Sequence, residues 1–211
     1  MPHNPDSAAH DWRTATGDVL DLIADMLGSL TPERWESPSL DAGWRIKDVA
    51  GHIVWRVGTP TRQLLASGSK AYLGKHLNPM KAIDDVSILT AQASYGDLVR
   101  DLRLSAEAHR SGRGRKNFGE LAEAVVHGFD MSNALGFDLS VNPSSTEAVA
   151  RSRMKLSPKN VRSVLKNRTL VATDAGWRIG RGDQWPGTAE AIVLFLCGRR
   201  PLAGGTFGPA E

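Results

Sequence analysis

The sequence LAEAVVHGFD, residues 121–130, predicts a helix that is buried on most of its sides, because hardly any polar residue interrupts its apolar run. We expect this helix to cover residues 118–135 and to end at Gly136, which suits a helix C-cap. Glu123 and His127 lie four positions apart, so their side chains share one face of the helix. A buried carboxylate is costly unless it is paired or bound to a metal, and one metal ion would satisfy both side chains.

The spacing of Glu123 and His127 does not by itself establish a metal site. An acidic residue four positions before a histidine also occurs at Asp6/His10 and Asp48/His52. The alternative is an ordinary hydrogen bond between Glu123 and His127, or a glutamate at the edge of the helix. A further ligand on another helix would favour the metal.

His52 is the candidate for that further ligand, and it lies in the sequence WRIKDVAGHI, residues 44–53, on another predicted helix. It flanks an apolar stripe, so it can point into a bundle; the stripe consists of Ile46, Val49, Ala50, Ile53 and Val57. Two imidazoles and one carboxylate suit zinc, and they leave a fourth position open for water or substrate. Asp48 or Asp130 could orient an imidazole by accepting a hydrogen bond from the ring nitrogen that does not face the metal. The alternative is a histidine at the core edge, held by Asp48 or by a backbone carbonyl.

The first two thirds of the chain predict a four-helix bundle over residues 1–139. Its helices are expected from a cap at Asp6 or Ser7 to residue 27, and over residues 45–67, 84–110 and 118–135. The third of these should turn its apolar residues inward, namely Val86, Leu89, Ala93, Leu98 and Leu102. Trp35 and Trp44 bracket a proline-rich loop and are interpreted as packing anchors, with the wall of a pocket as the alternative.

Residues 140–211 have a different character and predict a small α+β domain. Glu147 follows Ser144 by three positions, a capping-box pattern that predicts a fifth helix. Two short strands, residues 169–173 and 177–180, flank the turn sequence Asp174-Ala175-Gly176 and predict a hairpin. The apolar run at residues 187–197 predicts a final buried helix.

The composition narrows the class of protein. The 211 residues carry a net charge of +3 and are 41% hydrophobic, which is ordinary for a globular protein and too weakly basic to indicate nucleic-acid binding. No apolar run approaches the ~20 residues of a membrane span. The N-terminus has no hydrophobic signal region, and Cys197 is the single cysteine, so a cytoplasmic location is expected.

Several other features have simple interpretations. The tract of residues 151–168 holds seven basic and no acidic residues, and we interpret it as a solvated face, with nucleic-acid binding as the less favoured alternative. Cys197 is expected to be a core residue and not a nucleophile. Arg199 and Arg200 could hold an anionic substrate, but a solvated helix terminus is favoured. The remaining histidines are expected to be exposed, namely His3, His10, His76 and His109.

The metal-binding candidates lie in segments that resemble the mycothiol-dependent maleylpyruvate isomerase family of the DinB-like metal-binding four-helix bundle superfamily. The sequence LDAGWRIKDVAGH, residues 40–52, is similar to that family's first metal motif, and EAVVHGFDMSNALG, residues 123–136, is similar to the second. The resemblance implies that the ligands are His52, Glu123 and His127. It also implies a DinB-like bundle followed by a small α+β domain, to which residues 187–199 are similar.

For function, the resemblance implies a zinc-dependent enzyme that uses a low-molecular-weight thiol such as mycothiol in an isomerase or S-transferase reaction. The expected partners are a small-molecule substrate and the thiol cofactor, with no membrane and no nucleic acid. A non-catalytic metal-binding bundle with a regulatory or interaction role remains the alternative, since the family's ligands do not identify the reaction.

Overall fold

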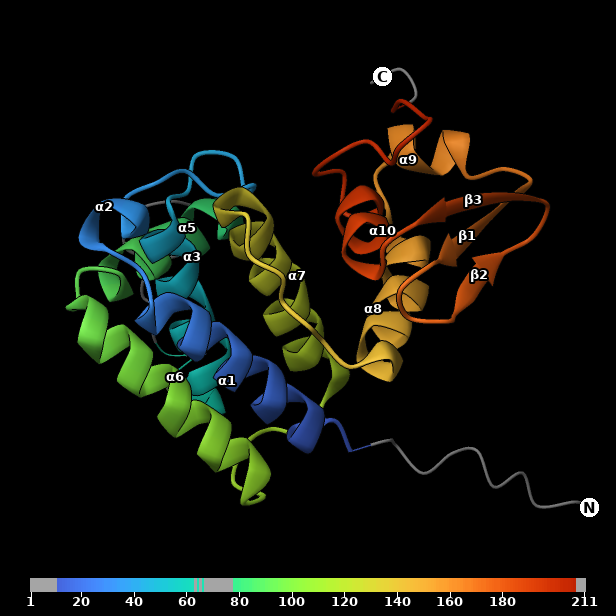
Figure 1. The fold of residues 1–211 in the computed structure, drawn as a ribbon. Coiled ribbons are helices and arrows are strands. Elements are labelled where there is room, and N and C mark those ends of the chain that lie inside the picture. Colours follow the sequence, from blue (N-terminus) through green and yellow to red (C-terminus); the bar gives the residue numbers. More distant parts are fainter. Residues whose placement is uncertain (1–10, 63, 65, 67–77, 208–211) are drawn as a thin grey trace, which may run out of the picture.

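Helix α7 (Phe118–Leu135) lies between the other helices of the N-terminal bundle and the C-terminal region in the computed structural model of the chain (Figure 1). The structure describes residues 11–62, 64, 66 and 78–207. The other N-terminal elements are α1 (Arg13–Gly28), α2 (Pro32–Trp35), α3 (Ile46–Ile53), the π-helix η2 (Val54–Gly58), α5 (Pro79–Thr90) and α6 (Tyr95–Arg110). The fold is mainly helical, as predicted.

The bundle core forms where α1, α3, α6 and α7 turn their apolar faces toward one another. Helix α1 packs against α6 and α7, while α3 packs against α5, α6 and α7. Buried aliphatic side chains fill the space between them, with Leu20, Ile23, Ile53, Leu98, Leu102 and Leu121 fully shielded from solvent. The prediction of α7 is confirmed in both bounds, and Gly136 ends the helix with a left-handed φ of 69°.

Three helix predictions need correction. The helix predicted over residues 84–110 is broken between Thr90 and Tyr95, because the Ser94 side chain accepts a hydrogen bond from the Asp97 amide and starts α6 anew. Leu89 is consequently 64% exposed rather than buried. The helix predicted over 45–67 passes into η2 and is interrupted after Gly58, although residues 61, 62, 64 and 66 are helical again. The first helix begins at Arg13 with Trp12 at its N-cap, and not from a cap at Asp6 or Ser7, which lie outside the described residues.

The C-terminal region contains α8 (Pro143–Leu156), α9 (Lys159–Val164), β1 (Arg168–Ala172), β2 (Arg178–Gly180), β3 (Asp183–Gly187) and α10 (Ala189–Leu196). The cap of α8 is Asn142, whose side chain accepts from the Ser144 amide, so the predicted capping box at Ser144 is wrong. The predicted hairpin is confirmed, since β1 pairs antiparallel with β2. Strand β3 was not predicted; it pairs parallel with β1 and gives the sheet order β2-β1-β3.

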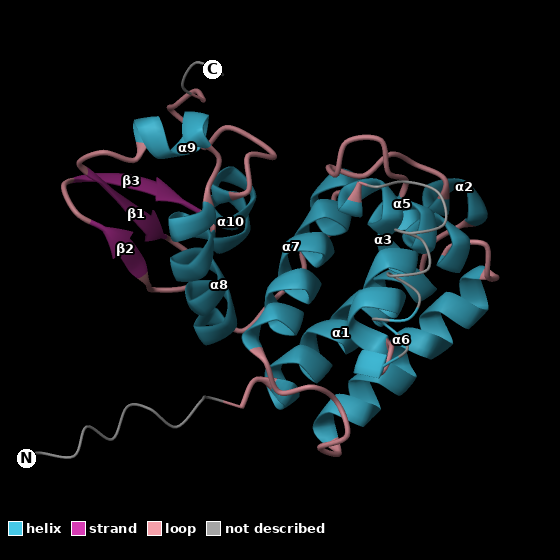
Figure 2. Cartoon of the chain, turned by 180° about the vertical axis from the view of Figure 1, so that it is seen from behind, coloured by secondary structure: helices cyan, strands magenta, loops and turns pink. Residues whose placement is uncertain are grey.

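The C-terminal region packs as a small α+β unit, with α10 against α8 and β1 (Figure 2). Helix α7 of the bundle contacts both α8 and α10, so this unit lies against the same helix that carries Glu123 and His127. The boundary between residues 139 and 140 stays a prediction. No helix in the described parts of the chain is both long and apolar enough to cross a membrane.

Candidate metal centre

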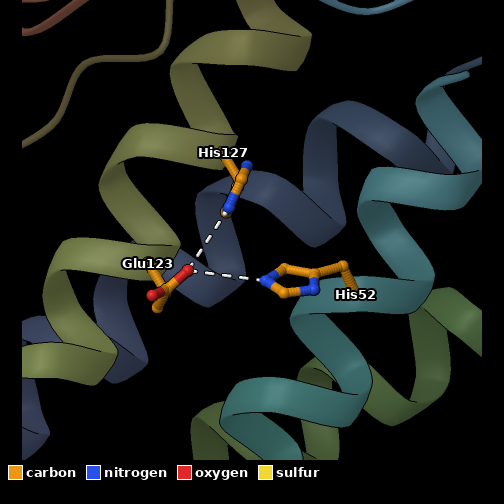
Figure 3. A group of neighbouring side chains, drawn as sticks. All are labelled: His52, Glu123 and His127. Carbon is orange, nitrogen blue, oxygen red and sulfur yellow. Dashed lines mark hydrogen bonds and ion pairs between the residues drawn. The ribbon is translucent and has the colours of Figure 1, made fainter. Parts of the chain in front are cut away.

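His52, Glu123 and His127 converge where α3 faces α7 (Figure 3). The Oε2 atom of Glu123 lies 3.4 Å from Nε2 of His52 and 3.3 Å from Nε2 of His127. All three potential ligand atoms lie within 4.8 Å of one another. The structure thus brings together the three residues that the sequence predicts as ligands, whereas ligation itself stays a prediction.

Helix α5 fixes the orientation of the His52 ring. The Nδ1 atom of His52 lies 3.0 Å from the Ser87 hydroxyl oxygen, and this hydroxyl donates its proton to the Ile83 carbonyl at 2.7 Å. Because the Ser87 proton is used in that bond, His52 must donate from Nδ1. In the neutral ring, Nε2 then carries the lone pair, and this atom faces Glu123.

The His127 ring is oriented in the same way by a carboxylate. Its Nδ1 atom lies 3.1 Å from Oδ2 of Asp130, a residue that is fully buried. The guanidinium of Arg199 donates two hydrogen bonds to the Asp130 carboxylate and also lies 2.8 Å from Asp41. With Nδ1 as the donor to Asp130, the Nε2 atom of His127 faces Glu123, as in the carboxylate–histidine pairs behind many zinc sites.

The electrostatics of the three residues favour a cation between them. Burial favours the neutral form of Glu123, but the hydrogen bond and the positive charge of His127 hold the pKa of its carboxyl well below the ordinary value. Burial would also lower the pKa of His127, yet its hydrogen bonds to Asp130 and Glu123 raise this pKa to about 9. The pKa of His52 is lowered, chiefly by burial. In the metal-free protein, the positive charge of the centre is therefore a proton bound to His127.

The donor set fits zinc. Two imidazole nitrogens and one carboxylate oxygen are the ligands of many catalytic zinc sites, and each imidazole here has a hydrogen-bond acceptor behind it. Two nitrogen lone pairs that face one carboxylate oxygen repel it unless a proton or a metal ion lies between them. The arrangement is therefore chemically complete only with a cation.

A cleft of about 650 Å³ opens over these side chains. Its bundle wall includes Trp44, whose ring lies 5.1 Å from the His52 ring and 6.3 Å from the His127 ring between centroids. The opposite wall comes from the C-terminal region and includes Arg153, Leu156 and Cys197. The cleft is large enough for a small organic molecule beside the three ligands.

The structure separates Asp48 from Asp130 as residues that orient an imidazole, and it separates Trp35 from Trp44 as packing anchors. Asp130 orients an imidazole as predicted, but Asp48 does not, because its carboxylate accepts from the backbone and guanidinium of Arg45 at the start of α3. Trp35 is a packing anchor that is 2% exposed and stacks on Tyr95. Trp44 instead forms part of the cleft wall.

Two further predictions are wrong. Arg199 is not a solvated helix terminus, because it is half-buried between Asp130 and Asp41. His109 is only 2% exposed, because the turn after α6 folds back over it; its Nε2 atom lies 3.0 Å from Glu120. The predictions for His3, His10 and His76 fall outside the described residues.

Cys197 lies at the edge of the cleft rather than fully in the core. Burial raises the pKa of its thiol to about 11, so the group stays protonated at neutral pH. This agrees with the prediction that it is not a nucleophile.

Ser87 and Asp41 are functional candidates that the sequence analysis did not single out. Ser87 lies within an apolar stretch of α5, where a serine gives no signal of its own. Asp41 lies in the loop before α3, within the segment of residues 40–52 that resembles the metal motif. The role of Ser87 is evident only from the packing of α5 against His52, and that of Asp41 only from its ion pair with Arg199.

The chain matches no protein-family model and no curated protein sequence. Its fold, however, matches the crystal structure of the mycothiol-dependent maleylpyruvate isomerase, with a TM-score of 0.53 and 13% identity over 89% of this chain and 88% of that chain. A structure of a histidine-to-alanine mutant of that isomerase matches with a TM-score of 0.51 over the same shares. The chain therefore has the fold that the sequence resemblance implied, and at 13% identity this likeness is one of fold.

Proposed function

We propose that the protein is a zinc-dependent enzyme that uses a low-molecular-weight thiol, such as mycothiol, in an isomerase or S-transferase reaction. The observation that carries this proposal is the position of His52, Glu123 and His127 beside an open cleft of about 650 Å³. A structural zinc site is closed by four protein ligands, whereas a catalytic site keeps one position open. The fold, which is similar to that of an isomerase named for its dependence on mycothiol, supports the same class.

The chain's own residues have distinct roles in this proposal. His52, Glu123 and His127 would hold the ion, and zinc, when bound, stabilises a thiolate at neutral pH. Trp44 shields the two imidazoles from solvent on one side of the cleft. The cleft is also lined by Arg56 and Arg153, whose charges suit a small acidic substrate.

The second candidate is a non-catalytic metal-binding bundle that serves a partner or a regulator. The cleft beside the candidate ligands favours the enzyme over this second candidate, because a non-catalytic metal-binding module needs no room for a substrate. We further propose that the protein binds a small-molecule substrate and the thiol, and that it binds neither a membrane nor nucleic acid. We also propose a cytoplasmic location.

Elemental analysis of the purified protein tests the metal site first. We expect about one zinc ion per chain, lost in His127→Ala and Glu123→Gln and retained in the control Glu107→Gln, which changes an exposed glutamate on α6. A protein without stoichiometric metal, or a Glu123→Gln variant with full metal content, would contradict the proposal.

Activity with a thiol then separates the two candidates. The metal-loaded protein should convert cis-alkene acids or transfer a thiol to an electrophile only when mycothiol or a related thiol is present. Glu123→Gln should abolish this turnover and Glu107→Gln should preserve it. Full metal content with no thiol-dependent turnover would favour the non-catalytic bundle.

A further inference from the structure

Arg199 connects the C-terminal unit to the candidate metal centre. It follows α10, where Gly198 takes a left-handed φ of 74° and the Arg199 amide donates to the Leu194 carbonyl at 2.9 Å. The backbone at this position is therefore fixed to α10. From there the side chain crosses to α7, and its Nε and Nη2 atoms donate to the two oxygens of Asp130 at 3.0 and 3.2 Å.

Asp130 connects Arg199 to His127, which is a candidate metal ligand. Its Oδ2 atom, which accepts from Arg199, also lies 3.1 Å from Nδ1 of His127. Asp130 is fully buried, so water cannot replace either partner. A bidentate guanidinium fixes the plane of a carboxylate as well as its charge, which a single lysine ammonium cannot do.

The guanidinium of Arg199 also forms an ion pair with the loop that precedes α3. Its Nη2 atom lies 2.8 Å from Asp41, and the amide of the adjacent Leu40 donates to the Asp130 carbonyl at 3.1 Å. Arg199 thus neutralises two carboxylates that flank one imidazole. Without it, Asp41 and Asp130 would repel each other beside His127.

We propose that Arg199 is a positioning residue for the metal centre, which acts through Asp130 to hold the His127 imidazole with its Nε2 atom toward the metal. The C-terminal unit thereby completes a centre whose ligands all belong to the bundle. This inference rests on the metal site of the proposed function, but it is independent of the thiol and of the reaction.

The neighbouring Arg200 provides a matched control. It is exposed and donates to the side chain of Asn133 on α7, so it also joins the C-terminal unit to the bundle, but it makes no contact with Asp130 or His127. Arg200→Met therefore removes an arginine bridge between the same two parts of the chain without touching the proposed relay.

The test measures metal affinity and ligand geometry in the full chain. Zinc affinity is obtained by competition with a chromophoric chelator, and cobalt(II) is substituted so that its visible absorption reports the geometry of the ligands. Arg199→Met and Asp130→Asn should each lower affinity about 10- to 100-fold and change the cobalt spectrum. Arg199→Lys should recover part of the affinity, and Arg200→Met should stay close to the original protein.

The double variant Arg199→Met/Asp130→Asn distinguishes a relay from two separate effects. If Arg199 acts through Asp130, the double variant should bind zinc no more weakly than Asp130→Asn alone. Should Arg199→Met fail to fold, Arg199→Lys carries the test, with a smaller loss of affinity and a changed cobalt spectrum expected.

An Arg199→Met variant, or in its place Arg199→Lys, with unchanged zinc affinity and an unchanged cobalt spectrum would overturn this inference alone. Additive losses in the double variant would also overturn it. An original protein that binds no zinc would overturn both this inference and the proposed function.

Discussion

The close approach of α3 and α5 at Gly51 sets the position of Ser87, so one added methyl group there tests the geometry of the centre. A Cβ atom at Gly51 would lie 2.7 Å from the Ser87 carbonyl oxygen and 2.7 Å from the Ala91 nitrogen. Both are backbone atoms, one in α5 and one in the residue that follows it, and they cannot rotate away as a side chain can. The contact is 0.7 Å short of the 3.4 Å at which ordinary van der Waals contact begins, so α5 must retreat by that amount.

This retreat would break the hydrogen bond behind His52. The bond from His52 Nδ1 to the Ser87 hydroxyl is 3.0 Å long, and a shift of 0.7 Å along it would stretch it to about 3.7 Å, beyond hydrogen-bond range. Gly51→Ala should therefore lower zinc affinity by at least about 10-fold. The variant should also lose about 1–3 kcal/mol of stability through overpacking, offset by about 1 kcal/mol from replacing glycine in a helix.

Zinc competition and denaturant unfolding of Gly51→Ala, Ser87→Ala and the double variant measure both effects. Ser87→Ala removes the same hydrogen bond without the clash, so the double variant should bind zinc no more weakly than Gly51→Ala. Gly96→Ala is the control, because Gly96 lies in α6 with nothing within 4 Å of an added Cβ. If Gly51→Ala binds zinc as tightly as the original protein, the α5 contact does not position His52.

Three further predictions concern stability. His109→Ala should lower the free energy of unfolding by about 3 kcal/mol in urea, because it removes one partner of the buried Glu120 carboxylate. In the metal-free protein, the raised pKa of His127 stabilises the fold below the ordinary value of 6.5, and this contribution should be lost as the pH rises through about 9; unfolding measured across this range checks it. Thr188→Ala should cost about 1 kcal/mol and lower the Tm, because Thr188 caps α10 through the Ala191 amide.

Each of these predictions has an outcome that contradicts it. Unchanged unfolding of His109→Ala would show that the buried pair contributes nothing to stability. A pH dependence that persists in His127→Gln would assign it to another group. A Thr188→Ala variant with an unchanged Tm would mean that packing alone holds the start of α10.

The sequence was sufficient for α7 because its signals are local. The apolar run, the glutamate and histidine one turn apart and the glycine at position 136 all act within a few residues, and the helix has the predicted bounds. The convergence of His52 with Glu123 and His127 was also predicted, although the residues alone left an ordinary hydrogen bond open. The likeness to known metal motifs decided between those interpretations, and the fold agrees with it.

The errors arise where distant segments meet. The burial of His109 depends on a turn that folds back over α6, and the pairing of Arg199 depends on where α10 docks, so composition near either residue indicates exposure. Strand β3 contains Trp185-Pro186-Gly187, a sequence that disfavours a strand until β1 lies beside it. The break between α5 and α6 depends on a single serine cap within an otherwise continuous helical pattern.

The ordinary hydrogen bond between Glu123 and His127 can now be weighed against the geometry. Such a bond needs one ring, yet two rings face the same oxygen of Glu123 at 3.3 and 3.4 Å. Each ring also has its other nitrogen held by an acceptor, which is Ser87 on α5 for His52 and Asp130, three residues further along α7, for His127. The buried pair of His109 and Glu120 also has such a contact, because Nδ1 of His109 lies 2.8 Å from the Ser105 carbonyl oxygen, so a partner behind one ring does not distinguish an ion pair from a metal ligand. What favours a metal over an ordinary hydrogen bond is that two oriented imidazoles converge on one carboxylate oxygen beside an open cleft.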